Sequence, residues 1–240
     1  GASHADLRVH RLHSQSLSLR DGAVQAAVDS IDTGLAVRVV VDGTWGFASH
    51  AELSPAVAAA TARQAIEVAR TLRALNRDRV ELADEPVYPD AVWVSPYEVD
   101  PFTVPTAQKV ARLAEFSRRL HDADEVDHVT AHCGQVKEQT FYADLAGSTI
   151  TQQRVRVAPQ LEATAVDRRT GEFETMRTLA PPVGRGWEYA AGDAHWDWSA
   201  VLAQLPGWLA EKARAPSVAA RIGSASARAW AASTGSGGGG

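Results

Sequence analysis

An Asp-Gly pair at residues 42–43 is the feature that most constrains how this chain can fold. It stands between the β-branched run at residues 35–41 and the strand-like TWGF at residues 44–47. An Asp-Gly pair between two such runs is the strongest short-range signal for a β-hairpin. The Asp21-Gly22 pair that follows the alternating residues 16–20 predicts another turn. The sequence therefore predicts a short antiparallel meander.

A long amphipathic helix is predicted directly after the meander. Ser54 supplies a capping hydroxyl and Pro55 takes the first helical position. Apolar residues then recur at helical spacing as far as Leu75. Upstream, residues 5–9 alternate as a strand does, and we expect that strand to pair with the run at 16–20.

The middle of the chain reads as a connector followed by a second set of elements. Five prolines fall between residues 86 and 105, a density that excludes a helix or a central strand. A helix is predicted at about 105–121, and the period then changes to two between residues 126 and 180. A last helix is expected at about 199–214, interrupted at Pro206.

These patterns predict an α+β fold. The N-terminal antiparallel meander with its one long helix would form a domain over residues 1–76, followed by a Pro-rich connector over 77–105. A second α+β domain with a mainly antiparallel sheet would cover 106–218. The Ala/Ser/Gly-rich residues 219–240 are predicted to be a disordered tail.

Four stretches of sequence closely resemble the N-terminal half of the TldD/PmbA family of metallopeptidases. They are LRDGAVQAAVDSIDTGLAVRVVVDGTWGFAS at 19–49, ELADEPVY at 81–88, VKEQTFYAD at 136–144 and RTLAPPVGRGWEY at 177–189. They occur in the family's order, and the resemblance extends over about residues 1–218. It covers the N-terminal and central regions of the family only.

The resemblance implies a zinc peptidase whose metal ligands lie beyond this region. Family members carry a His-Glu-x-x-x-His helix and a distant cysteine in the half that follows. They form a cytoplasmic assembly of two related subunits that admits unfolded peptide. The implied partners of this chain are thus a related TldD/PmbA-type subunit, the missing C-terminal catalytic domain and, in the full assembly, an unfolded peptide substrate.

The chain itself offers no such metal motif, because none of its eight histidines precedes a glutamate. The nearest imitation is His128, His132 and Cys133. In a strand the two histidines share a face about 13 Å apart, too far for one zinc ion, and Cys133 points to the other face. We therefore reject this set as a metal site and predict no catalytic residue, no metal and no cofactor in this chain. Cys133 is expected to be an inert buried thiol.

One segment is a candidate for peptide or subunit contact. Gly184 and Gly186 would let the backbone approach a peptide closely, Arg185 could bind a carboxylate, and Trp187 follows them. The alternative, which the pattern favours, is a tight turn whose glycines take positive φ, with Trp187 in the core. Farther on, the tryptophans Trp196, Trp198 and Trp208 could cover a surface that another domain buries.

Composition excludes several other classes of function. The net charge is −5 and no long basic run exists, so no nucleic-acid partner is expected. No stretch reaches the roughly 18 to 20 apolar residues that cross a bilayer, so no membrane role is expected. The single cysteine cannot form an internal disulfide, which fits a cytoplasmic location. The sequence starts at Gly1, and its only methionine is Met176, so we expect preceding sequence to be missing.

The sequence thus predicts the non-catalytic N-terminal portion of a TldD-like zinc metallopeptidase, which acts on unfolded peptides at family level. Such a truncated chain would serve in subunit assembly and peptide placement and would be inactive as a hydrolase alone. The alternative is a stand-alone, non-enzymatic binding or assembly module of the same fold. A His-Glu-x-x-x-His encoded downstream of Val218 would favour the first.

Overall fold

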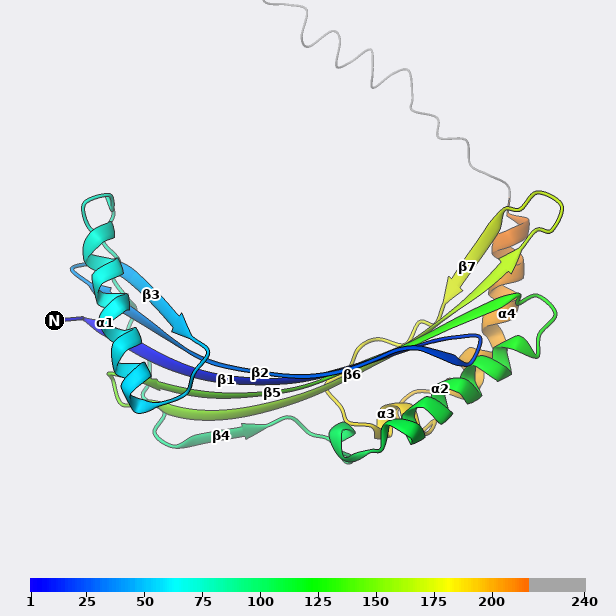
Figure 1. Ribbon diagram of the computed structural model, residues 1–240, viewed down its shortest axis with the longest axis horizontal. Helices are drawn as coiled ribbons and strands as arrows, with labels where there is room; N and C mark the ends of the chain where they lie inside the picture. The colour runs from blue at the N-terminus through cyan, green and yellow to red at the C-terminus, as the bar shows by residue number, and fades with distance from the viewer. Residues whose placement is uncertain (216–240) are drawn as a thin grey trace, which may run out of the picture.

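The computed structural model describes residues 1–215, so the predicted tail at 219–240 lies outside the described residues. One curved sheet runs through the molecule, with helices at its two ends (Figure 1). The strands are β1 (His4–Arg20), β2 (Ala23–Val41), β3 (Thr44–His50), β4 (Ala91–Val94), β5 (His128–Asp144), β6 (Thr149–Val166) and β7 (Phe173–Arg177). The helices are α1 (Pro55–Leu72), α2 (Thr106–His121), α3 (Glu188–Ala191) and α4 (Trp198–Arg214), with a 3-10 turn at Pro101–Thr103.

The strand order in the sheet is β3-β2-β1-β5-β6-β4, and β7 also pairs with β6. Every pair is antiparallel except β4 with β6. The predicted α+β class with mainly antiparallel strands is confirmed. The predicted division into domains stays a prediction. In the structure β1 pairs with β5, so both parts of the chain contribute strands to one sheet.

The first strand differs from its prediction. The alternating run at 5–9 and the run at 16–20 do not pair with one another, because both belong to the single 17-residue strand β1. Its neighbours are β2 on one side and β5 on the other. The polar residues between the two runs look like a break in the sequence, yet they continue the strand through the open middle of the sheet.

Both hairpins of the N-terminal meander turn on an Asp-Gly pair, as predicted. Asp21 and Gly22 have φ of 49° and 77°, and Asp42 and Gly43 have φ of 49° and 72°. Two successive residues with positive φ are typical of the type I′ turn, which matches the twist of paired strands. These turns fix the register of β1 against β2 and of β2 against β3.

The sheet carries a separate hydrophobic core at each end. At one end α1 packs on β2 and β3 around Val37, Val39 and Ala65. At the other end α2 and α4 cover β5 and β6 around a larger cluster that contains Phe116, Leu161 and Trp198. The predicted cap of α1 is confirmed, because Ser54 Oγ accepts a hydrogen bond from the Val57 amide at 3.2 Å.

Two features of the second half correct the sequence interpretation, and a third, the edge strand β4, agrees with the exclusion of a central strand. Helix α4 is continuous through Pro206, which is buried, as are Leu205 and Leu209 of the same helix. That burial offsets the hydrogen bond that a proline removes from a helix. Trp198 is fully buried and donates to the Tyr189 carbonyl at 2.7 Å, so it belongs to the core rather than to an exposed surface. The proline-rich connector contains the short strand β4, which lies at the edge of the sheet, where strands near prolines are tolerated.

Candidate functional site

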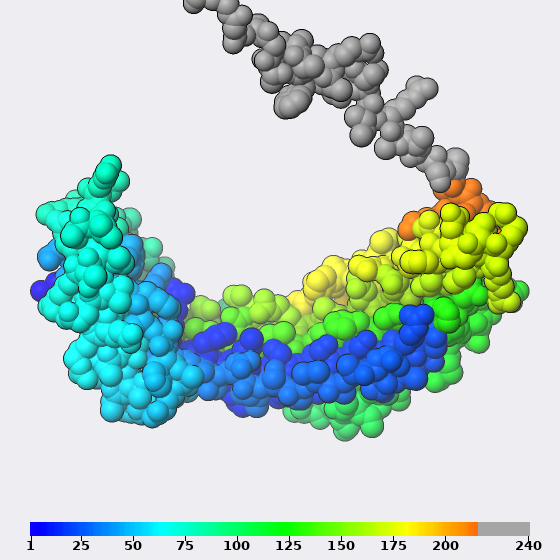
Figure 2. All heavy atoms as spheres, turned by 45° about the horizontal axis from the view of Figure 1, so that its top comes forward, coloured from blue at the N-terminus to red at the C-terminus, as the bar shows by residue number. Residues whose placement is uncertain are grey.

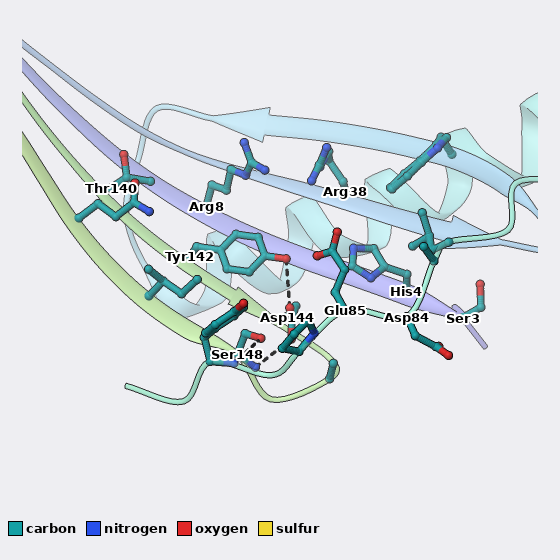
Figure 3. A pocket seen from close by; sticks show the side chains of 18 residues that line it. Ser3, His4, Arg8, Arg38, Asp84, Glu85, Thr140, Tyr142, Asp144 and Ser148 are labelled. Carbon is teal, nitrogen blue, oxygen red and sulfur yellow. Dashed lines mark hydrogen bonds between the residues drawn. The ribbon is translucent and has the colours of Figure 1, made fainter. Parts of the chain in front are cut away.

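The two faces of the long sheet differ because side chains alternate along each strand. Odd-numbered residues of β1, such as Leu7, Leu17 and Leu19, pack under the helices at the two ends. The even-numbered residues point to the other face. On that face the strands β1, β2 and β5 form the floor of a hollow of about 880 Å³ near the start of β1 (Figure 3).

A buried carboxylate organises the floor of this hollow. The Asp6 side chain is only 1% exposed and accepts hydrogen bonds from Arg38 Nε at 2.9 Å and Nη2 at 2.7 Å. His4 Nε2 lies 3.2 Å from the same carboxylate, and Arg8 Nε lies 3.7 Å from it. The hydrogen bonds to Asp6 raise the pKa of Arg38. Two guanidinium groups therefore share the buried Asp6 carboxylate, and a second carboxylate, Asp144, also lines the hollow.

Aromatic rings hold both arginines in place. The Arg8 guanidinium lies 5.6 Å from the centroid of the Tyr142 ring, and that of Arg38 lies 5.4 Å from the Trp45 ring. The Tyr142 hydroxyl donates to Asp144 at 3.1 Å. Burial, together with this hydrogen bond, raises the pKa of Tyr142 to about 12. The phenol is thus neutral at physiological pH and serves as a donor and a packing surface, not as a base.

The segment 81–87, here called the strap, forms the opposite wall of the hollow. It is anchored before its start, where the Val80 amide donates to the Gly43 carbonyl at 2.9 Å. It is anchored after its end, where the Tyr88 amide donates to Ser148 Oγ and the Tyr88 carbonyl accepts from Thr149. Every residue of the strap is exposed. Between its anchors the strap makes no hydrogen bond to the rest of residues 1–215.

A second accessible feature is the free edge of β2 at residues 23–33. Strand β3 pairs with β2 only over Leu35–Val41, and no other described strand pairs with the remainder on that side. All residues from 23 to 33 are exposed, including Val24, Val28 and Ile31. Figure 2 shows this hairpin as a blue rim between the two ends of the molecule. Eleven strand residues extend roughly 36 Å, and the edge has no proline or lysine to discourage pairing.

The residues rejected as a metal site lie as the strand pattern predicts. His128 and His132 are both on β5, where His128 contacts Asp21 and His132 contacts Ser16. Cys133 is on the opposite face and fully buried, and burial raises the pKa of its thiol to about 12. Side chains that point to opposite faces of a sheet cannot share an ion. Within residues 1–215 no group of three His, Cys, Asp or Glu side chains is arranged so that it could hold a metal ion, so the described residues do not fit a zinc ion.

The predicted contact segment at 184–187 is partly buried. A Cβ on Gly186 would stand 2.0 Å from the Val99 carbonyl oxygen, and Trp187 is 3% exposed in the core. The Gly186 and Val99 amides both donate to the Glu188 carboxylate. Neither Gly184 nor Gly186 has positive φ, so close backbone approach explains Gly186 better than turn geometry does. Gly184 and Arg185 are the more accessible part of this segment, and its role in contacts stays a prediction.

Comparison with known proteins shows which family this chain resembles. Residues 5–69 match the family model described as PmbA/TldA metallopeptidase domain 1. Residues 5–69 thus resemble the first domain of the TldD/PmbA family. The predicted resemblance is confirmed. A protein from Methanothermobacter thermautotrophicus named "Metalloprotease" is 28% identical over 164 residues, which are 68% of this chain and 34% of that protein. The chain thus spans about a third of the length of this curated relative.

Solved structures share the fold of this TldD/PmbA-like chain. TldE from Thermococcus kodakarensis matches with a TM-score of 0.57 and 14% identity, over 87% of this chain and 44% of that one. A Thermotoga maritima protein described as a candidate modulator of a DNA gyrase matches with a TM-score of 0.60 and 11% identity, over 85% and 43%. At such identities the likeness concerns the fold. No helix within residues 1–215 has the length and apolarity needed to cross a membrane.

Sequence reasoning missed both accessible features of this TldD/PmbA-like chain. Asp6 and Arg8 were interpreted only as the polar half of an alternating strand, although that alternation already placed both on one face, and Arg38 was interpreted only as part of the β-branched run at 35–41. Residues 23–34 were assigned to no strand, since AVQAAVDSIDTG lacks alternation. The spacing of the two Asp-Gly turns does indicate that strand, because the 19 residues between them are enough for one long strand. That strand, β2, is similar in length to the 17-residue β1 with which it pairs.

Proposed function

We propose that this chain is the N-terminal, non-catalytic portion of a TldD-type zinc metallopeptidase, and that it places unfolded peptide and contacts a related subunit. The family match at residues 5–69 and the name of the curated relative, "Metalloprotease", support the metallopeptidase context. A cytoplasmic location, the zinc ion and the hydrolytic step in a C-terminal half belong to the same proposal. Because the described residues do not fit a zinc ion, no hydrolysis is assigned to them.

The observation that carries the proposal is the free edge of β2 at residues 23–33. An edge strand presents unpaired N–H and C=O groups, and an extended peptide can pair with them whatever its sequence. The side chains along this edge are small or moderately apolar, and its only charged residues are Asp29 and Asp32. Such an edge suits a neutral or basic segment of unfolded chain better than an acidic one.

The first test measures binding of a permanently unfolded protein to the purified chain. Reduced and carboxyamidomethylated ribonuclease A, a basic chain, is the probe, and fluorescence anisotropy gives the affinity. Val28→Lys should weaken binding by about tenfold, because a lysine on an edge opposes strand pairing. Val92→Lys is the matched control, since Val92 is 73% exposed on the other edge strand, β4. Equal effects of the two substitutions, or no binding to the unsubstituted chain, would contradict peptide placement by β2.

The second test concerns the metal and the related subunit. The purified chain should contain no stoichiometric zinc and show no EDTA-sensitive peptidase activity, whereas a longer product of the same gene should show both. Size-exclusion chromatography with a matching TldD/PmbA-type subunit should show a complex. Peptide binding without any such complex would favour the alternative, a stand-alone binding or assembly module of the same fold.

A further inference from the structure

The hollow lies on the open face of the sheet, the face that carries the even-numbered side chains of β1. It contains side chains of opposite charge that form no ion pair with one another. The Arg8 side chain on its floor is 52% exposed and makes no side-chain hydrogen bond within residues 1–215, so its donors are free. Its ion pair with Asp6 is long, with 3.7 Å between Nε and the carboxylate. A guanidinium in this state can bind a carboxylate through two parallel hydrogen bonds.

The strap supplies the opposite charge. Figure 3 shows the Glu85 carboxylate directed toward the floor, near Arg38 and Tyr142, whereas the Asp84 carboxylate points away. No ion pair joins Glu85 to either arginine among the described residues, where Arg8 and Arg38 both contact Asp6. The empty volume therefore lies between the exposed Arg8 guanidinium on the floor and the Glu85 carboxylate on the strap.

The remaining lining fits an apolar group of moderate size. Trp45, Tyr142 and Ile150 face the hollow from the sheet, and Leu82 faces it from the strap. A second hollow of about 350 Å³ shares Arg8 and Thr140 with the first and continues along the strands. Small-molecule sites commonly enclose about 300 to 1,000 Å³ and combine apolar walls with a few polar groups. The space is sufficient for a compound of two or three residues.

We propose that this hollow binds a short peptide with free termini, as a zwitterion. The peptide carboxylate pairs with the Arg8 guanidinium on the floor, and the ammonium group pairs with Glu85 on the strap. Because the strap is held only at its two ends, it can move toward the floor as the ligand links the two charges. The proposal is independent of strand pairing at β2, since the hollow lies on the open face and the free edge lies at residues 23–33.

Calorimetric titration of the purified chain with glycyl-phenylalanine tests the proposal. The dipeptide should bind with a dissociation constant in or below the millimolar range. Its C-terminal amide and its N-acetyl derivative should each bind about tenfold more weakly, because each lacks one of the two charges. Equal affinity for the dipeptide and its amide would overturn the proposal, and so would no binding at roughly 10 mM dipeptide.

Two substitutions test which side chain binds the carboxylate of the ligand and which binds its ammonium group. Arg8→Gln should weaken dipeptide binding about tenfold and leave the weak binding of the amide unchanged. Arg11→Gln is the control, because Arg11 is on the same strand but on the opposite face, where it contacts Gln139. Glu85→Gln, on the exposed strap, should weaken binding of the dipeptide but not of its N-acetyl derivative. Equal losses for Arg8→Gln and Arg11→Gln would show that the floor is not the binding site.

Discussion

Gly46 on β3 lies directly against Ala65 on α1, with no room for a side chain between them. A Cβ on Gly46 would stand 2.0 Å from the Ala65 carbonyl oxygen and 2.8 Å from the Ala69 amide nitrogen. Both are backbone atoms, so neither can turn aside. The helix therefore packs on the strand backbone to backbone, and this contact sets the distance between α1 and the sheet.

We predict that Gly46→Ala destabilises the chain by about 3 kcal/mol, because α1 must shift away from the sheet. Urea unfolding followed by far-UV circular dichroism gives the change in free energy. Gly207→Ala is the matched control, since Gly207 lies within α4 and a Cβ there would meet nothing within 4 Å. That control should stabilise the chain by about 0.5 to 1 kcal/mol, because alanine favours a helix. A Gly46→Ala variant as stable as the unsubstituted chain would contradict the close packing.

A second glycine tests the segment at 184–187. Gly186→Ala should lower stability by about 2 to 3 kcal/mol, because the new Cβ would meet the Val99 carbonyl oxygen and crowd Glu188. Gly184→Ala should change stability by less than about 0.5 kcal/mol, since its nearest neighbour would be 3.9 Å away. Thermal unfolding of both variants provides the comparison. Similar losses for the two would show that Gly186 is not held by this approach.

The sequence correctly predicted the structural features that depend on a few neighbouring residues. The Asp-Gly turns, the Ser54 cap and the alternation on β5 each depend on a few neighbouring residues, and all three are confirmed. The pairing of β1 with β5 depends on residues more than a hundred positions apart, for example Leu17 and Cys133. No local sequence pattern specifies that β1 pairs with β5. The sequence therefore could not show whether the strands form one sheet or two.

The candidate site was hidden for a related reason. The hollow brings together residues from β1, β2, β5 and the strap, and its geometry exists only once the strands are in register. The sequence did reveal that Asp6 and Arg8 share a face. It could not reveal that Arg38 lies beside Asp6, because that contact follows from the register of β1 against β2.

The stability of the chain should depend on pH through Asp21. The Asp21 carboxylate accepts a hydrogen bond from the Val129 amide at 2.7 Å and contacts His121 and His128, each at 2.9 Å. Burial alone would raise its pKa, but these hydrogen bonds outweigh burial and lower the pKa from 3.8 to about 2. A carboxyl whose pKa is lower in the folded state stabilises that state above the unfolded pKa. The contribution is therefore lost as pH falls from about 4 to about 2.

Asp21→Asn should remove this dependence. We expect it to cost about 1 kcal/mol at pH 6, after allowance for solvent screening of a partly exposed group, and almost nothing at pH 2. Urea unfolding at both pH values gives the comparison. Asp42→Asn is the control, because Asp42 has the same φ of 49° in the other Asp-Gly turn. A cost for Asp21→Asn that is the same at pH 6 and pH 2 would contradict the proposed cause.

Cys133 should be unreactive in the folded chain. Its thiol is fully buried, and burial raises its pKa to about 12, so the reactive thiolate is scarce at neutral pH. Labelling with 5,5′-dithiobis(2-nitrobenzoate) at pH 8 should therefore be at least about a hundredfold slower than in 6 M guanidinium chloride. Rapid labelling of the folded chain would show that β5 opens readily from the core.

Arg38 and Arg8 should differ in their effect on stability, although both contact Asp6. Arg38 makes the hydrogen bonds that satisfy the buried carboxylate, so Arg38→Met should cost about 2 kcal/mol by leaving Asp6 poorly compensated. Arg8→Met should cost less than about 1 kcal/mol, since its guanidinium is farther away and more exposed. Replacing both partners, as in Asp6→Leu with Arg38→Met, should recover most of the loss, because no buried charge remains. Urea unfolding of the three variants measures these differences, and equal costs for Arg38→Met and Arg8→Met would show that Asp6 does not depend on Arg38.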